Sequence, residues 1–129
     1  MDANQKLQEL KEALRASEEK VRQAPEDLNL RFDLAKLYYL ASLNDKSLEL
    51  FKALSGKGDL RRQCDVNFYL GRLRMRQNDY NAAITDFYKA MSQTASMEMR
   101  MQVGHSLVQC LMQEGWVDEA LRIKRQLGL

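Results

Sequence analysis

The stretch that decides the fold is FYLGRLRMRQNDYNAAITDFYKAM, which runs from Phe68 to Met91. Apolar residues recur in it every three or four positions, which is the period of an amphipathic helix. The polar residues at 77–79 interrupt that period and predict a turn between two helices. Gly71 lies in the first helix and Ala83 in the second, where small side chains allow close approach. The stretch therefore predicts a helical hairpin in which Gly71 faces Ala83.

Helical periodicity extends over nearly the whole chain of 129 residues, and alternating Val/Ile/Thr runs are nearly absent. Breaks are expected at Pro25, at SGKGD (55–59) and near SQTAS (92–96). Asp45 is expected to cap the third helix. We therefore predict an all-α protein with helices at 4–23, 28–43, 46–54, 60–77, 80–92, 97–113 and 116–127.

Features of the opening stretch repeat at an interval of 36 or 37 residues. Ala35 lies 36 positions before Gly71, and a further step of 37 leads to Val108. A fixed interval of this size is typical of stacked helical hairpins, since one hairpin cannot bury its own apolar face. The sequence predicts hairpins over 28–55, 64–92 and 97–129, preceded by an N-terminal helix at 1–25.

This pattern resembles the tetratricopeptide repeat (TPR) family, whose units carry Leu-Gly, then an aromatic residue, then Ala-x-x-x-Phe. The middle unit matches with Leu70–Gly71, Tyr80 and Ala83-x-x-x-Phe87. The resemblance implies an all-α, right-handed superhelix of about three hairpins in a single domain, 1–129. It also implies that Tyr80 and Phe87 fill the seam toward the neighbouring hairpin.

Three positions depart from the family pattern. Val108 replaces the small residue of the third unit, so that hairpin is expected to open or to cross differently. Gly104 occupies a place where the family has a large residue. Arg74 stands where an aromatic side chain would pack, and its stem either lies along the surface or finds a carboxylate.

The resemblance implies a non-enzymatic protein-interaction module, an adaptor or a co-chaperone-like scaffold. In this family the first helix of each hairpin lines a concave groove that holds a peptide, and Asp65 and Gln102 share the faces concerned. The aromatic residues among the candidates suit the protein core equally well. The mixture suits a peptide with apolar anchors and some acidic residues. The candidates are Asn29, Phe32, Lys36, Tyr39, Phe68, Arg72, Met75, Arg76, His105, Gln109 and Met112.

An alternative function is a structural subunit that forms homo-oligomers through its terminal helices. The last helix has no successor to cover it, and Ile123 and Leu127 lie four positions apart on it. If both side chains stay exposed, they form an apolar oligomer interface.

The remaining features exclude other classes of function. The net charge of +2 is too small to indicate a nucleic acid partner, and the absence of a run of eighteen apolar residues argues against membrane insertion. The polar first residues lack the apolar core of a secretory signal, which favours the cytoplasm. No cofactor is expected, because SGKGD lacks the context of a nucleotide site. No metal ion is expected, because the two cysteines have no Cys or His neighbours at metal-ligand spacing.

Catalytic chemistry is not expected either. Cys64 and Cys110 lie 46 positions apart without metal-ligand spacing, and we interpret them as free, buried thiols. His105 is the only histidine, and no nucleophile shares its helical face.

Overall fold

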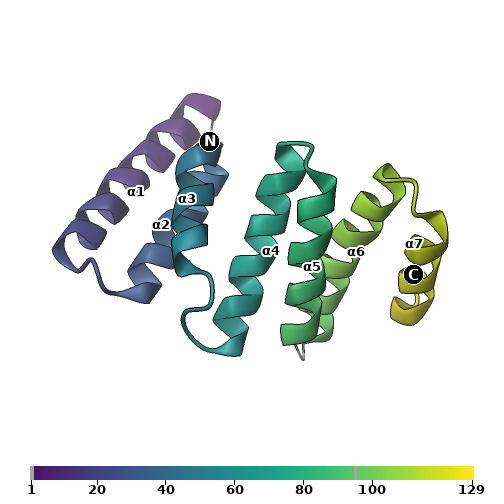
Figure 1. Ribbon diagram of the computed structural model, residues 1–129. Helices are drawn as coiled ribbons and strands as arrows, with labels where there is room; N and C mark the ends of the chain where they lie inside the picture. Colours follow the sequence, from purple (N-terminus) through teal and green to yellow (C-terminus); the bar gives the residue numbers. More distant parts are fainter. Residues whose placement is uncertain (1, 95) are drawn as a thin grey trace. The chain divides into compact units, whose positions relative to one another are not determined.

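The computed structural model describes residues 2–94 and 96–129, and every regular element in this part of the chain is a helix (Figure 1). The all-α prediction is confirmed, and α2 shows the largest difference in bounds, because it ends at Leu40 rather than at residue 43. In order, the helices are α1 (Ala3–Gln23), α2 (Leu28–Leu40), α3 (Asn44–Leu54), α4 (Leu60–Arg76), α5 (Tyr80–Gln93), α6 (Met97–Gln113) and α7 (Val117–Leu127).

Short polar side chains fix where most helices begin. Asp59 Oδ1 accepts a hydrogen bond from the backbone N–H of Arg62 at 2.9 Å, at the start of α4. Asp2, Asp27, Asp79 and Ser96 cap α1, α2, α5 and α6 in the same way. The prediction for Asp45 is wrong, since α3 begins at Asn44 and Asp45 lies within its first turn.

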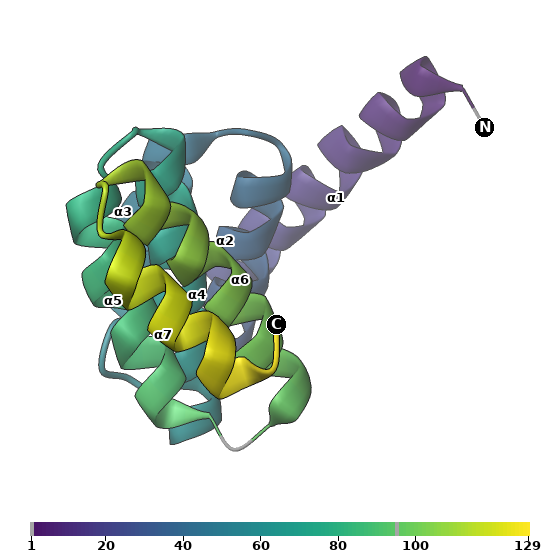
Figure 2. The same ribbon diagram turned by 90° about the vertical axis from the view of Figure 1, so that its right-hand side faces the viewer.

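The chain divides into two compact units, Met1–Leu54 and Ser55–Leu129. In the first unit α1 packs on α2, and α2 pairs with α3 as the first hairpin. In the second unit α4 pairs with α5 as the second hairpin and α6 with α7 as the third; α5 also packs on α6 (Figure 2). That residues 1–129 form a single domain stays a prediction.

The hairpin turns repeat as the sequence repeats. Ser42, Asn78 and Gly115 all have left-handed backbone, with φ of 59°, 60° and 78°. In each turn, the residue that follows donates a hydrogen bond from its backbone N–H to the carbonyl oxygen five positions before it. The three N···O distances are 2.8–2.9 Å. The three turn residues are 36 and 37 positions apart, so the predicted period is present in the backbone.

In the first hairpin, small residues bring the helices together. Ser47 is fully buried, and its Oγ donates a hydrogen bond to the carbonyl oxygen of Ala35 at 2.9 Å. Beside this contact, the rings of Phe32 and Phe51 meet edge to face at 5.8 Å. A side chain larger than serine would separate these two helices.

In the second hairpin, Gly71 contacts an aromatic ring. A Cβ atom at this position would lie 2.5 Å from Cε1 of Phe87, a fully buried residue of α5. Phe87 follows Ala83 by one helical turn, and both belong to the same core. The sequence therefore identified the correct pair of helices, whereas the side chain that needs the glycine is Phe87. The Phe87 ring thus packs between the two helices of its own hairpin, in addition to the predicted place between neighbouring hairpins.

The third hairpin achieves close contact one turn away from the expected position. A Cβ on Gly104 would lie 2.0 Å from Cδ1 of Leu127, so the glycine receives the leucine of α7. Val108, at the expected position, is half-buried against the core. The two helices of this hairpin pack against each other, and Gly104 is a site of their close approach.

A buried ion pair ties α4 to α5. The guanidinium nitrogen Nη1 of Arg74 donates to both carboxylate oxygens of Asp86, at 2.6 and 2.8 Å. The Asp86 side chain is only 4% exposed, and burial raises its pKa while the Arg74 guanidinium opposes that rise. Of the two interpretations of Arg74, the structure selects the one in which it finds a carboxylate.

Candidate functional site

The first helices of the second and third hairpins meet along one side of the second unit. α4 contacts α6 directly, and Nη1 of Arg72 donates to Oγ of Ser106 at 3.3 Å. Phe68 is half-buried on the same side of α4, with its ring 6.2 Å from that of Phe87. This surface, lined by Phe68, Arg72, Arg76, His105 and Gln109, is called the α4/α6 face below.

Candidates on α6 form an exposed row. His105, Gln109 and Met112 are spaced by four and three residues, so they share one helical face, and all three are exposed. On α4, Arg76 is exposed, whereas Met75 packs against the core. The structure therefore brings together most of the second-unit candidates, and Met75 contributes mainly to packing.

Candidates in the first unit differ in their exposure. Phe32 is 4% exposed and packs on Phe51, so it belongs to the core rather than to a groove. Lys36 places its Nζ 5.5 Å from the centre of the Phe32 ring, a cation–π contact. Tyr39 is half-buried and Asn29 is exposed.

The predicted oligomer interface is wrong in its residues. Ile123 is 5% exposed and belongs to the core of the second unit, and Leu127 packs against Gly104. Both point toward α6 because their spacing of four matches the buried stripe of α7. The large apolar side chains left exposed on the third hairpin and the chain end are Met97, Met112, Trp116, Val117, Leu121 and Leu129.

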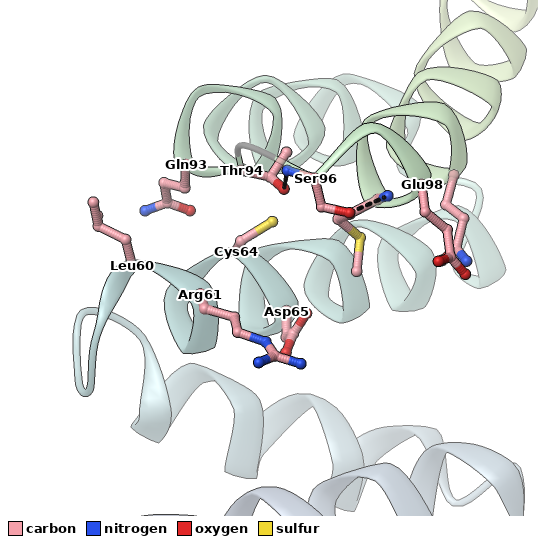
Figure 3. Close-up of a pocket in the computed structure, with 10 residues that line it drawn as sticks. Leu60, Arg61, Cys64, Asp65, Gln93, Thr94, Ser96 and Glu98 are labelled. Carbon is pink, nitrogen blue, oxygen red and sulfur yellow. Dashed lines mark hydrogen bonds between the residues drawn. The ribbon is translucent and has the colours of Figure 1, made fainter.

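A pocket of about 620 Å³ adjoins the α4/α6 face (Figure 3). It lies between the first two turns of α4, the end of α5 and the first turns of α6. Ser96 shapes its rim, since its N–H donates to Thr94 Oγ1 at 3.1 Å while its Oγ caps α6. The lining residues are Leu60, Arg61, Cys64, Asp65, Gln93, Thr94, Ser96, Glu98, Met99 and Gln102.

The pocket combines an apolar base with charged walls. Cys64 and Met99 supply sulfur-containing side chains, and Asp65 and Glu98 supply carboxylates from two different helices. Sequence reasoning placed Asp65 and Gln102 on groove-facing sides but missed Arg61 and Glu98. A signal existed for Glu98, which precedes Gln102 by four positions and so shares its helical face.

The two thiols at and near this site are buried. Cys64 is buried and its Sγ lies 3.3 Å from the carbonyl oxygen of Ala90. Burial raises its pKa, and the charge of Asp65 raises it further. Burial likewise raises the pKa of Cys110 to about 11. Because the reactive species is the thiolate, burial and a raised pKa both disfavour reaction of these thiols at neutral pH. The prediction of free, buried thiols is confirmed.

We expect neither cysteine to react with Ellman's reagent at pH 7.5 in the folded protein, since both thiols are buried and protonated. In concentrated urea, both should react at once. The measurement is the absorbance of the released thionitrobenzoate over time. A rapid one-thiol burst without denaturant would contradict the burial of these side chains.

Two further features of the described residues bear on function. Over 2–94 and 96–129, no three His, Cys, Asp or Glu side chains converge as the ligands of a metal ion would. None of the helices in these ranges combines the length and the apolar character needed to cross a bilayer.

No known protein-family profile matches the sequence, and no curated protein does. Solved structures of MamA, an all-helical protein of TPR type, are similar in fold. MamA MSR-1 superposes with a TM-score of 0.76 at 18% identity, over 95% of this chain and 68% of that one. The MamA D159K mutant superposes with a TM-score of 0.74 at 18% identity, over 92% of this chain and 66% of that one. Another MamA crystal structure superposes with a TM-score of 0.57 at 16% identity, over 98% of this chain and 93% of that one.

This chain thus spans about two thirds of the length of the first two MamA structures. At identities of 16–18%, the likeness shows the fold and no more. The TPR resemblance is supported at the level of fold: the chain is an all-helical, TPR-like arrangement of hairpins.

Proposed function

We propose that this chain is a non-enzymatic protein-interaction module that holds a peptide segment of another protein on the α4/α6 face. A TPR-like fold supports a scaffold or interaction role in general terms. The peptide and its place on the molecule are the specific part of the proposal.

One observation carries the proposal: two helices from successive hairpins line one face, and a row of polar side chains stands on it. Arg72 is held in place by Ser106, so its charge is presented without a large cost in side-chain entropy. His105 and Gln109 lie alongside and are exposed. A peptide laid on this face meets hydrogen-bonding groups from one helix and apolar surface from Phe68.

The non-enzymatic part of the proposal follows from the chemistry of these groups. Both thiols are buried with raised pKa values, and His105 has no cysteine within its own exposed row. A general base needs a nucleophile or substrate within hydrogen-bond reach. Binding requires only a complementary surface, and the exposed His105 and Gln109 support the α4/α6 face as that surface.

Replacing His105 and Gln109 together by glutamate is expected to weaken peptide or partner binding at least tenfold. The two new charges stand in the middle of the face and remove two hydrogen-bonding side chains. The measurement is quantitative pull-down with the full chain as bait, followed by mass spectrometry, with the wild-type chain run in parallel.

The matched control is Asn81→Glu with Thr85→Glu. These positions are also exposed and four residues apart, but lie on α5 away from the face. Both double variants add two charges at the same helical spacing, so their effects on stability should be similar. If the His105/Gln109 variant retains every partner that the control retains, the α4/α6 face is not the binding surface.

A second candidate function is self-assembly, favoured by the exposed apolar side chains of the third hairpin. Trp116, Val117 and Leu121 are 44–51% exposed within one short stretch. Leu121→Glu should convert an oligomer into a monomer, as measured by multi-angle light scattering over a concentration series. A wild-type chain that is monomeric at every concentration would reject this candidate.

A further inference from the structure

We propose that two copies of this chain pair through the outer side of α7, as an antiparallel, two-fold symmetric dimer centred near Leu121. The inference rests on the second candidate function, self-assembly, and deepens it by naming the partner and its orientation. The partner is a second copy of the chain, because the charges on the outer side of α7 complement themselves when the helix is turned end to end.

Two different sides of α7 carry apolar side chains. Ala120 and Ile123 are buried in the core of the second unit, and Leu127 packs against the same core. Val117 and Leu121 stand four positions apart on another side, and they are 44% and 47% exposed. Figure 2 shows α7 in front of α6, with no helix of the second unit over its outer side. This outer side is therefore an unpartnered apolar stripe.

Exposed charges flank the stripe and are sorted along the helix. Asp118 lies in the first turn of α7, whereas Lys124 and Arg125 lie in its last turns, and all three side chains are exposed. The other acidic residue of α7, Glu119, is already paired with Arg122. Over residues 2–94 and 96–129, no ion pair involves Asp118, Lys124 or Arg125. Both signs of charge are thus available to a partner.

The spacing of these charges selects the antiparallel orientation. Asp118 and Arg125 are seven positions apart, two helical turns, so they stand on the same edge of the Val117–Leu121 stripe. Leu121 lies between them, three positions after one and four before the other. In an antiparallel pair centred there, each Asp118 carboxylate faces the Arg125 guanidinium of the second copy. A parallel pair would instead place equal charges side by side, which is unfavourable.

The same arrangement covers the apolar stripe. The two Leu121 side chains meet at the centre, and the aliphatic stem of Lys124 lies over Val117 of the second copy. Because the two copies use the same surface, the contact closes at the dimer and builds nothing larger. One helix face is smaller than a standard interface of roughly 1,600 Å², so we expect a weak dimer with a Kd of about 10–100 µM.

Charge exchange between copies tests the pairing. We expect Asp118→Arg alone and Arg125→Asp alone each to raise the Kd of the dimer about tenfold, since each change places like charges together at two symmetry-related points. An equimolar mixture of these two variants, and the double variant Asp118→Arg/Arg125→Asp, should both return to within about threefold of the wild-type Kd. The measurement is sedimentation equilibrium of the full chain from about 5 to 500 µM.

Recovery in the mixture separates pairing from folding, because a variant that fails to fold is not rescued by another variant. The matched control is Asp33→Arg, which makes the same change of charge at an exposed position of α2 and should leave the Kd unchanged.

The possible results assign the failure. If the wild-type chain is monomeric over the whole range, self-assembly fails and this dimer with it. If the chain associates but the single variants match the control, if the mixture shows no recovery, or if the wild type forms species larger than a dimer, the antiparallel α7 pair is wrong while self-assembly stands.

Discussion

Replacing Arg74 by methionine is expected to destabilise the second unit by about 3–5 kcal/mol at neutral pH, the range for removing one partner of a buried ion pair. Methionine preserves much of the length and the apolar stem of the arginine. It leaves the Asp86 carboxylate, 4% exposed, without the guanidinium that binds both of its oxygens. An uncompensated buried charge costs far more than an exposed one.

The loss should depend on pH with a definite sign. Burial already raises the pKa of Asp86, and Arg74 opposes that rise, so removal of Arg74 raises the pKa further. A carboxyl group with a raised pKa in the folded state stabilises the fold below its unfolded pKa, and this contribution is lost as the pH rises through the folded pKa. The deficit of the variant relative to wild type is therefore largest at neutral pH and shrinks as the pH falls toward about 4.

Urea unfolding followed by tryptophan fluorescence measures this effect in the correct unit, because Trp116 is the only tryptophan of the chain. The double variant Arg74→Met/Asp86→Leu is the matched control, since it removes the buried charge together with its partner. It should recover most of the lost stability. A single variant that loses less than about 1 kcal/mol at pH 7 would show that the pair is not effectively buried.

Replacing Gly71 by alanine is the second large change, with an expected loss of about 2 kcal/mol from overpacking. Three atoms of the Phe87 ring lie within 2.5–2.8 Å of the position that the new Cβ would occupy. The ring is fully buried and rigid, so the helices themselves must move apart. This cost exceeds the gain of about 1 kcal/mol that alanine brings to a helix interior.

Gly104→Ala provides the matched control in the same unit. There the closest atom is the terminal Cδ1 of Leu127, a side chain that is only half-buried and able to rotate. We expect a loss below about 1 kcal/mol, because the leucine changes rotamer at small cost. Gly71→Ala combined with Phe87→Leu should regain part of the stability. Equal losses for the two alanine variants would contradict the close contact of Gly71 with the ring.

The helices and their repeat could be predicted because both are properties of local sequence. Apolar residues at intervals of three and four, together with Pro25 and the polar breaks, define helix limits without knowledge of neighbours. The small residues Gly71 and Ala83 marked two helices that approach closely.

The candidate site was only partly predictable. Helical spacing placed His105, Gln109 and Met112 on one exposed face, as the structure has them. The same spacing could not tell Phe32, which is buried, from Phe68, which is half-buried, since both lie on groove-facing turns. The pocket was not predicted as a unit, because Leu60, Thr94 and Glu98 come from three separate segments.

By itself, the sequence determined the all-helical class, the interval of 36–37 residues and the pairing of consecutive helices, because periodicity and turn residues act within a few positions of the chain. Only the tertiary structure decided which side chains occupy the close contacts. Phe87 rather than Ala83 meets Gly71, Gly104 rather than Val108 admits Leu127, and Asp86 rather than solvent receives Arg74. Each outcome depends on the rotation and rise of one helix against another, which set distances that no single segment encodes.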